Sequence, residues 1–173
     1  MSASGAAGTT AFVGLGANLG DPAVQLTDAL ASLADAGVLV AYSGVYRSAP
    51  VGGPDQPPFL NLVAELEVPD GPYELLARCQ ALESAARRIR RERWGPRTLD
   101  VDVLLFGDLV IDDPVLTVPH PRMRERRFVL DPLAELAPEL VSSNELRAVA
   151  DQDCVRIADP VELRSRAKSS PVA

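Results

Sequence analysis

Residue types on which common catalytic and redox sites depend are scarce in this chain. Its 173 residues include two cysteines, one histidine and one lysine. Cys79 and Cys154 are far apart and fit no metal-binding or disulfide-exchange spacing, which favours reduced thiols in a cytoplasmic protein. The only lysine, Lys168, lies near the C-terminal end, so the sequence has no lysine for a Walker A phosphate loop.

Long apolar runs and a secretion signal are also absent from the sequence. No apolar run approaches the roughly 20 residues that a membrane-spanning helix needs. The first residues contain neither a basic n-region nor an apolar h-region, and we expect residues 1–10 to be disordered. The length predicts one domain, at residues 11–160, followed by a flexible tail at 161–173. Because no self-complementary apolar patch is evident, we expect a monomer.

The charged residues are unevenly distributed. A net charge of −7 argues against nonspecific binding to nucleic acid or to an acidic membrane. The arginines nevertheless gather in two segments, which predicts a focused site for a small, highly charged anion. A solvated helix face is the alternative, and the sequence leaves it open. The clusters are Arg87, Arg88, Arg90, Arg91, Arg93 and Arg97 in the first segment, and Arg122, Arg124, Arg126 and Arg127 in the second.

Apolar periodicity and turn residues predict alternating strands and helices. Their order, βαββαβ, is the ferredoxin-like arrangement of the α+β class, with an antiparallel-rich sheet and both long helices on one face. The expected strands are 11–16, 38–46, 59–68 and a run from Asp100, and the expected helices run from Pro22, capped by Asp21, to Gly37 and from Pro72 to about Arg90. Extra short elements follow Gly107, including helices at 131–136 and 145–150 and a strand at 155–158.

Asp100 and Asp102 stand inside an otherwise apolar, strand-like run. A buried, unpaired carboxylate is costly, so such acids pair with cations or bind metal. Residues i and i+2 of a strand point to the same face, so the two carboxylates would converge on a site about 6.5–7 Å long. That spacing suits one or two hard divalent cations such as Mg²⁺. The flanking residues are too apolar for an edge strand in water, although exposed acids on a solvated face remain the alternative.

Three further features carry weaker signals. The run Gly14–Gly20 lacks the spacing of a dinucleotide fingerprint and favours a glycine-rich turn before a helix. Phe59 and Asn61 share one strand face, which suits a flat heterocycle or, alternatively, a core aromatic with a turn-bonding amide. They follow a proline-rich loop, 48–58, and long loops of this kind are often functional lids. His120, in a loop before the second arginine cluster, would either donate to a phosphate or be structural.

Together these features indicate metal-assisted phosphoryl transfer to a planar acceptor. The sequence resembles the 6-hydroxymethyl-7,8-dihydropterin pyrophosphokinase family of folate biosynthesis over about residues 11–140. The resemblance implies transfer of the pyrophosphoryl group of ATP to the hydroxymethyl oxygen of the pterin, with release of AMP. The matching segments are Gly16–Gly20, Tyr46–Pro50, Asp55–Pro57, Phe59–Asn61, Arg93–Asp102 and Pro119-His120, with Arg126 and Phe128.

The resemblance also implies roles for individual residues. Asp100 and Asp102 would hold two Mg²⁺ ions that bridge the triphosphate and the acceptor oxygen. Arg88 and Arg97 would act with them in catalysis by neutralising the moving phosphates. The implied ATP-binding residues are Gln80, Glu83, Arg88, Arg90, Trp94, Arg97, Val103, Thr117, His120 and Arg126. The implied pterin-binding residues are Ser48, Pro50, Val51, Phe59, Asn61, Trp94 and Phe128, with the two phenylalanines stacking on the ring.

Positioning and charge stabilisation carry reactions of this kind, so we expect no protein nucleophile and no obligatory general base. The loops 44–58 and 87–97 are expected to order over bound ATP as lids. Pro121, Phe59 and Ala49 depart from residues frequent in the family, and the segment after residue 142 matches none of its motifs. Two other functions stay open, a nucleotide-binding or regulatory domain without catalysis and phosphotransfer to another small heterocyclic alcohol. The paired aspartates argue against the first, because acids repel phosphate unless a metal intervenes.

Overall fold

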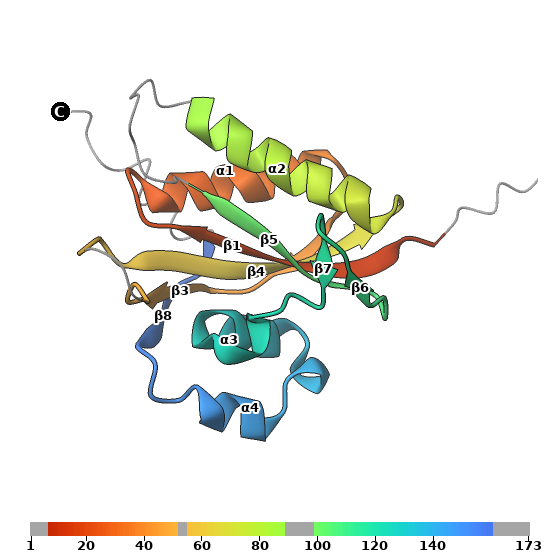
Figure 1. Ribbon diagram of the computed structural model, residues 1–173. Coiled ribbons are helices and arrows are strands. Elements are labelled where there is room, and N and C mark those ends of the chain that lie inside the picture. Colours follow the sequence, from red (N-terminus) through yellow and green to blue (C-terminus); the bar gives the residue numbers. More distant parts are fainter. Residues whose placement is uncertain (1–6, 52–54, 89–98, 161–173) are drawn as a thin grey trace, which may run out of the picture.

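The computed structural model describes residues 7–51, 55–88 and 99–160. These residues form a central sheet with helices on both faces (Figure 1). Among them, no helix has both the length and the apolar character that crossing a membrane requires. The strands are β1 (Thr9–Ala17), β2 (Leu39–Tyr42), β3 (Val45–Ser48), β4 (Phe59–Val68), β5 (Asp100–Phe106), β6 (Ile111–Asp112), β7 (Thr117–Val118) and β8 (Cys154–Ala158). The α-helices are α1 (Pro22–Asp35), α2 (Pro72–Arg88), α3 (Arg127–Leu136) and α4 (Ser143–Ala148).

The large sheet has the strand order β5-β1-β4-β3-β8, with β2 also paired to β4. Each of these pairs is antiparallel. The α+β, ferredoxin-like prediction is confirmed, including the placement of α1 and α2 on one face (Figure 1). The β-rich stretch 38–46 forms two strands, however, because the extended backbone is interrupted at Ser43 and Gly44. There the Ser43 hydroxyl accepts the N–H of Val63 at 3.0 Å and donates to the Gly44 carbonyl at 2.8 Å.

The helix-side core follows from the alternation of the strands. Side chains such as Val13, Leu15 and Leu66 point toward the helices, where Leu26 and Leu75 pack against them with no more than 2% of their surface exposed. The predicted cap of α1 is present, since the Asp21 carboxylate accepts the N–H of Val24 at 3.2 Å. This core packs one face of the sheet against α1 and α2, and the other face of the sheet is available for a second layer.

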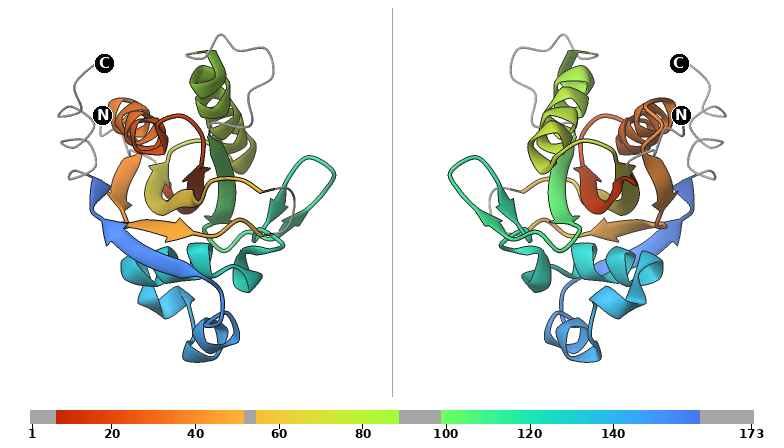
Figure 2. Two further views of the ribbon diagram at one scale, coloured as in Figure 1. Left: turned by 90° about the vertical axis from the view of Figure 1, so that its left-hand side faces the viewer. Right: turned by 90° about the vertical axis from the view of Figure 1, so that its right-hand side faces the viewer.

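The second layer is α3, which begins at Arg127 and is therefore longer than the predicted helix at 131–136. It packs on a separate apolar cluster that includes Phe12, Val63 and Leu104 from the sheet and Leu130 from α3. Figure 2 shows α3 and α4 on the face opposite α1 and α2, with β8 along the outer edge beside β3. The helix predicted at 145–150 and the strand predicted at 155–158 correspond to α4 and β8.

The position of β5 corrects one sequence-based expectation. We expected this strand to be too apolar for an edge, yet β5 ends the sheet order. Its apolar side chains are nevertheless buried, because Val101 and Val103 face the helix-side core and Leu104 faces α3. The backbone N–H of His120 donates to the Leu104 carbonyl at 2.9 Å along the strand's outer edge. The apolar composition of β5 therefore reflects the burial of side chains on both of its faces. It does not indicate how many strands β5 pairs with.

Glu135 attaches α3 to the opposite edge of the sheet. Its carboxylate accepts bonds from the Gly44 N–H at 2.9 Å, the Tyr46 hydroxyl at 2.7 Å and the Arg156 guanidinium at 3.2 Å. Burial, the strongest single influence, acts to raise the pKa of Glu135, but the bonds from Arg156, Tyr46 and Gly44 together outweigh it and lower that pKa. The carboxylate therefore stays ionised and stabilises the fold under neutral conditions.

This lowered pKa predicts the pH dependence of the Glu135→Gln variant. The stabilisation by a carboxylate with a depressed pKa is fully present above its unfolded value, about 4.3, and is lost as the pH falls through the folded value. We expect the variant to be less stable than wild type at pH 7 and the difference to shrink below about pH 4. Urea unfolding at both pH values measures this, and a difference that is constant with pH would contradict it.

Candidate active site

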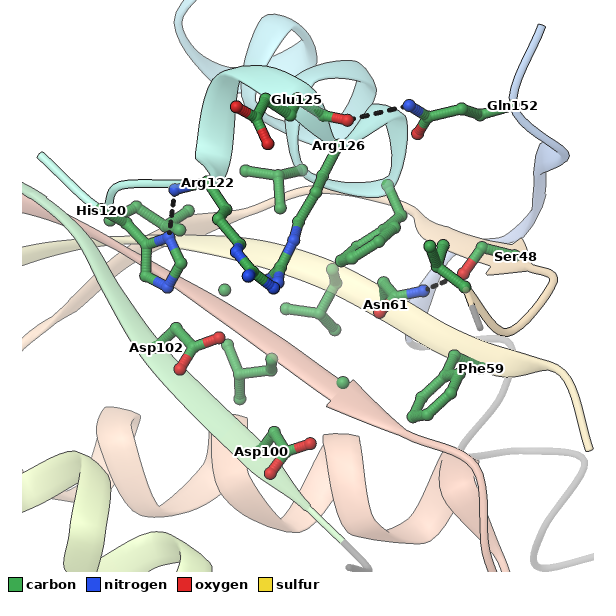
Figure 3. A pocket seen from close by; sticks show the side chains of 18 of the residues that line it. Ser48, Phe59, Asn61, Asp100, Asp102, His120, Arg122, Glu125, Arg126 and Gln152 are labelled. Atoms are coloured by element: carbon green, nitrogen blue, oxygen red, sulfur yellow. Dashed lines mark hydrogen bonds between the residues drawn. The ribbon is translucent and has the colours of Figure 1, made fainter. Parts of the chain in front are cut away.

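A pocket of about 510 Å³ opens where the sheet meets the segment that leads into α3 (Figure 3). Strands β1, β4 and β5 form its floor, and residues 120–129 form the wall above. Carboxylate, imidazole, guanidinium, amide and aromatic side chains share this space. The polar and aromatic lining residues are Ser48, Phe59, Asn61, Asp100, Asp102, His120, Arg122, Glu125, Arg126, Phe128 and Gln152.

Asp100 and Asp102 both line this pocket from β5, as the strand alternation predicts (Figure 3). Asp100 is half-buried and Asp102 is exposed. The acids are thus not buried in the apolar strand, because its apolar residues at 101 and 103 point to the helix side. The desolvation argument fails for this reason, whereas the convergence of the two carboxylates on one site holds.

Beside these acids, β1 contributes two glycines to the pocket floor, so no side chain projects there. Gly14 pairs with Asp102 and Gly16 pairs with Asp100 in the antiparallel register. A Cβ atom at Gly16 would lie 2.9 Å from the Asn61 Oδ1, so a larger residue would displace that amide. Both glycines belong to β1, which confirms the strand predicted at 11–16, and the turn before the helix comes at Gly20, where φ is 65°.

Glu83 anchors α2 to β5 at the level of the acids. Its carboxylate accepts the N–H of Val101, the residue between Asp100 and Asp102, at 2.9 Å. In the described part of the chain, no group of three or more His, Cys, Asp or Glu side chains is arranged to hold a metal ion. The carboxylate pair still fits Mg²⁺, which commonly takes one or two protein carboxylates and completes its coordination with water and phosphate oxygens.

His120 lies across the pocket from Asp102 (Figure 3). Burial lowers the pKa of His120, the nearby Asp102 carboxylate opposes this, and Arg126 and Arg122 lower the pKa further. The ring is therefore neutral at pH 7. Its Nδ1 accepts the N–H of Arg122 at 3.2 Å, so the proton of the neutral ring is on Nε2. The imidazole thus offers one N–H donor to the pocket. The sequence had left open whether His120 donates to a phosphate or is structural, and a free donor is what the first role requires.

Two arginines of the second cluster point into the pocket from above (Figure 3). Arg126, an implied ATP-binding residue, lies with its guanidinium carbon 5.6 Å from the centre of the Phe128 ring. Arg122 was counted in the cluster but was not given a site role. Its sequence signals were its membership of that cluster and its position two residues after His120. Both cations face a pocket whose floor carries two carboxylates, a charge pattern that suits an anion bound together with metal.

The other end of the pocket carries the aromatic and amide groups. Phe59 and Asn61 line it from β4, with Phe128 above and Ser48 beside them. Asn61 is buried, and its Nδ2 donates to the Ser48 hydroxyl at 2.9 Å. Val51 also lines the pocket and has 83% of its surface exposed. Two phenylalanines and one amide thus line this end of the pocket.

The predicted lid at 44–58 is partly a strand. Val45–Ser48 forms β3, which pairs with both β4 and β8. Closer to β4, the side chain of Asn18 holds the loop by donating to the Gln56 Oε1 at 3.0 Å and to the Pro57 carbonyl at 3.2 Å. The lid prediction therefore fails for Val45–Ser48, and its residues 52–54 lie outside the described part of the chain.

Several implied residues lie elsewhere or outside the description. In the part of the chain that the structure describes, the pocket lining does not include Gln80, Glu83, Val103, Thr117 or Pro50. Gln80 is exposed on α2, Val103 is buried on the helix side, and Thr117 and Pro50 are half-buried. Arg88 is the last residue of α2, and its side chain lies outside the described residues, as do Arg90, Trp94, Arg97 and most of the lid predicted at 87–97.

Comparison with known proteins matches residues 12–138 to the family model of 7,8-dihydro-6-hydroxymethylpterin-pyrophosphokinase. A 2-amino-4-hydroxy-6-hydroxymethyldihydropteridine pyrophosphokinase of Pseudomonas aeruginosa is 49% identical over 132 residues, covering 75% of this chain and 81% of the relative. The protein of the same name from Bacillus subtilis is 43% identical over 149 residues, covering 85% of this chain and 89% of the relative.

Solved structures with low sequence identity share the fold. The crystal structure of wild-type Plasmodium falciparum HPPK-DHPS is 15% identical, with a TM-score of 0.61, and covers 92% of this chain and 41% of that chain. A structure of HPPK-DHPS in complex with substrates is 12% identical, with a TM-score of 0.62, and covers 95% of this chain and 44% of that chain. This chain thus spans less than half the length of those two proteins. The family match and the curated relatives show that the chain belongs to the 7,8-dihydro-6-hydroxymethylpterin-pyrophosphokinase family.

Proposed function

We propose that this pyrophosphokinase transfers the terminal pyrophosphoryl group of ATP to 6-hydroxymethyl-7,8-dihydropterin, releasing AMP, with Mg²⁺ held by Asp100 and Asp102. The hydroxymethyl oxygen forms a bond to the β-phosphorus, the bond from that phosphorus to the oxygen of AMP breaks, and the hydroxyl proton goes to solvent. One observation carries the proposal. Paired carboxylates, donors to anions and an aromatic–amide ring site line the same pocket.

The carboxylate end of the pocket is where the phosphates would bind. Mg²⁺ bound to Asp100 and Asp102 would neutralise charge on the phosphate oxygens and orient them for in-line displacement. The strand geometry fits one ion or two, and the family resemblance favours two. The protein itself supplies the rigid β5 strand, which keeps both carboxylates on one face.

Donors on the opposite wall would hold the phosphates from above. Arg126 and Arg122 would pair with the phosphate oxygens, as guanidinium groups do, and the Nε2–H of His120 would donate to another oxygen. Because the His120 ring is neutral, it donates without adding a positive charge to the arginines beside it. Arg88 and Arg97 belong to the same proposal on the family resemblance alone.

The pterin would occupy the other end of the pocket. Phe59 and Phe128 would stack on its faces, and the Asn61 amide would bond to its edge, which carries both donors and acceptors. Ser48 holds that amide in place through its hydroxyl. A ring bound there would place its hydroxymethyl group toward the carboxylates, between the two ends of the same cavity.

No protein nucleophile is needed for this reaction. Both cysteines are free and buried, and burial raises the pKa of Cys79 to about 12 and that of Cys154 to about 11. Neither thiol would be ionised at neutral pH, so neither would act as a nucleophile. Direct attack by the acceptor oxygen remains, with positioning and charge neutralisation as the contribution of the protein.

The nucleotide product tests this function directly. The purified protein is incubated with ATP, MgCl₂ and 6-hydroxymethyl-7,8-dihydropterin, and the nucleotides are separated by ion-exchange chromatography. We expect AMP to form in equal amount to the pterin pyrophosphate, and neither to form without the pterin. ADP as the product would instead indicate transfer of a single phosphoryl group. ATP binding without turnover would favour the nucleotide-binding domain without catalysis.

A further inference from the structure

The segment 150–154 lies beyond the part of the chain that matches the family model, yet it reaches the pocket through Gln152 (Figure 3). The side chain of Gln152 forms two bonds with the backbone on either side of Arg126. Its Oε1 accepts the N–H of Arg127 at 2.9 Å, and its Nε2 donates to the Glu125 carbonyl at 2.8 Å. One amide therefore holds both peptide units that flank the residue whose guanidinium enters the pocket.

A side chain of the α3 segment also bonds to the backbone of the 150–154 segment. The guanidinium of Arg127 donates to the carbonyls of Ala150 at 3.1 Å and Gln152 at 2.9 Å, and it pairs with Asp131 at 3.0 Å. Arg126 is the N-cap residue of α3, and its own side chain makes no capping bond. A guanidinium has no acceptor for a helix N–H, so Gln152 supplies that acceptor from outside the helix.

The next two residues of this segment, Asp153 and Cys154, contact the pterin end of the site. The Asp153 carbonyl accepts the N–H of Ala49 at 3.4 Å, and Cys154 pairs with Ser48 where β8 joins β3. Ser48 in turn accepts the bond from Asn61. The phosphate-facing backbone and the pterin-facing strand are thus attached to the same short stretch of chain.

We propose that Gln152 is a positioning residue that directs Arg126 toward the phosphates by clamping the backbone at Glu125 and Arg127, and that the 150–154 segment sets the spacing between the two ends of the site. The inference rests on the proposed function, because Arg126 needs a phosphate to act on. Misplacement of a binding group by about 1 Å is enough to lower a rate by up to ~10²-fold, so a backbone clamp can affect catalysis without touching substrate.

The decisive experiment is a double-mutant cycle between Gln152 and Arg126. Gln152→Met keeps the length of the side chain and removes both bonds, and we expect kcat/KM for ATP to fall about tenfold. In the Arg126→Ala background the same change should cost less than about twofold, since the residue it positions is gone. The KM for the pterin should stay within about twofold. An equal loss in both backgrounds, or no loss in wild type, would overturn the proposal.

Two further variants separate positioning from stability. Gln152→Glu keeps the acceptor for the Arg127 N–H and loses the donor to the Glu125 carbonyl. Its kcat/KM for ATP should therefore lie between those of wild type and Gln152→Met. Ser142→Ala removes the capping box of α4 in the same C-terminal region without touching the Arg126 backbone. It should lower the melting temperature and leave kcat/KM unchanged. If Ser142→Ala lowers kcat/KM as much as Gln152→Met, the role of Gln152 is structural only.

A binding measurement keeps this test apart from the test of function. The affinity of each variant for Mg²⁺ and α,β-methylene-ATP, measured by calorimetry, requires no turnover. Gln152→Met should weaken it about tenfold in the wild-type background and less than about twofold with Arg126→Ala. Wild type that binds the analogue but forms no AMP would reject the proposed reaction, and the calorimetric cycle would still decide the role of Gln152.

Discussion

Changing both Asp100 and Asp102 to asparagine lowers the rate of AMP formation by about 10³-fold or more. Loss of metal-based charge stabilisation costs several kcal/mol in the transition state, and each 1.36 kcal/mol is a factor of about ten in rate. Asparagine has the shape of aspartate but not its charge. Because Asp102 is exposed and Asp100 only half-buried, the fold should tolerate both changes. Steady-state AMP formation at saturating ATP, pterin and MgCl₂ measures the effect.

The matched control is Asp108→Asn with Asp112→Asn. Both acids are exposed, follow β5 closely in the chain and lie outside the pocket lining, so the pair removes the same two charges from the same region. We expect this control to keep wild-type turnover. A second measurement does not depend on turnover: Mg²⁺ should tighten ATP-analogue binding to wild type and to the control but not to the doubly substituted site. Turnover within tenfold of wild type in the Asp100/Asp102 variant would remove the carboxylate pair from the mechanism.

The elements that could be predicted are those with strong local patterns. The strand at Phe59–Val68 was predicted with the observed bounds, because alternation and flanking prolines mark both of its ends. The break between β2 and β3 depends on the Ser43 hydroxyl meeting Val63, a contact between residues far apart in the sequence. The true start of α3 at Arg127 depends likewise on Gln152. Such contacts leave no periodic trace, so local patterns could not have located them.

The site divides in the same way. Asp100 with Asp102 and Phe59 with Asn61 were found from strand alternation, and the structure brings both pairs to one pocket. Their connection to His120 and the second arginine cluster was a hypothesis from residue chemistry, and the ATP-binding role of Arg126 came from the family resemblance. Gln152 was missed, because nothing in its polar neighbourhood distinguishes a glutamine that clamps the backbone of another segment from one that faces solvent. The burial assumed for the acids was wrong because α3 covers Leu104 on this face of β5, whereas Asp100 and Asp102 line a pocket.

The largest effect on the acceptor side is expected from Asn61→Leu. Asn61 is 6% exposed, and its amide is held between the Ser48 hydroxyl at 2.9 Å and the bare backbone of Gly16, with which it pairs across β1 and β4. Leucine has a similar volume and removes both the donor and the acceptor. Sites built to bond a polar ring lose about 1–3 kcal/mol for each bond left unmade. We therefore expect kcat/KM for the pterin to fall about 100-fold, with the KM for ATP within about twofold.

Gly16→Ala separates the position of that amide from its chemistry. The added Cβ would lie 2.9 Å from the Asn61 Oδ1, closer than ordinary contacts allow, so the amide must shift while keeping its donor and acceptor. The expected result is a smaller loss in the same parameter, about tenfold in kcat/KM for the pterin, because a shifted amide still bonds but at poorer geometry. Thermal unfolding of both variants identifies any loss caused by misfolding. If Asn61→Leu were folded and its pterin KM stayed within about threefold of wild type, the ring edge would be bound elsewhere. The floor of the pocket would then contribute shape alone.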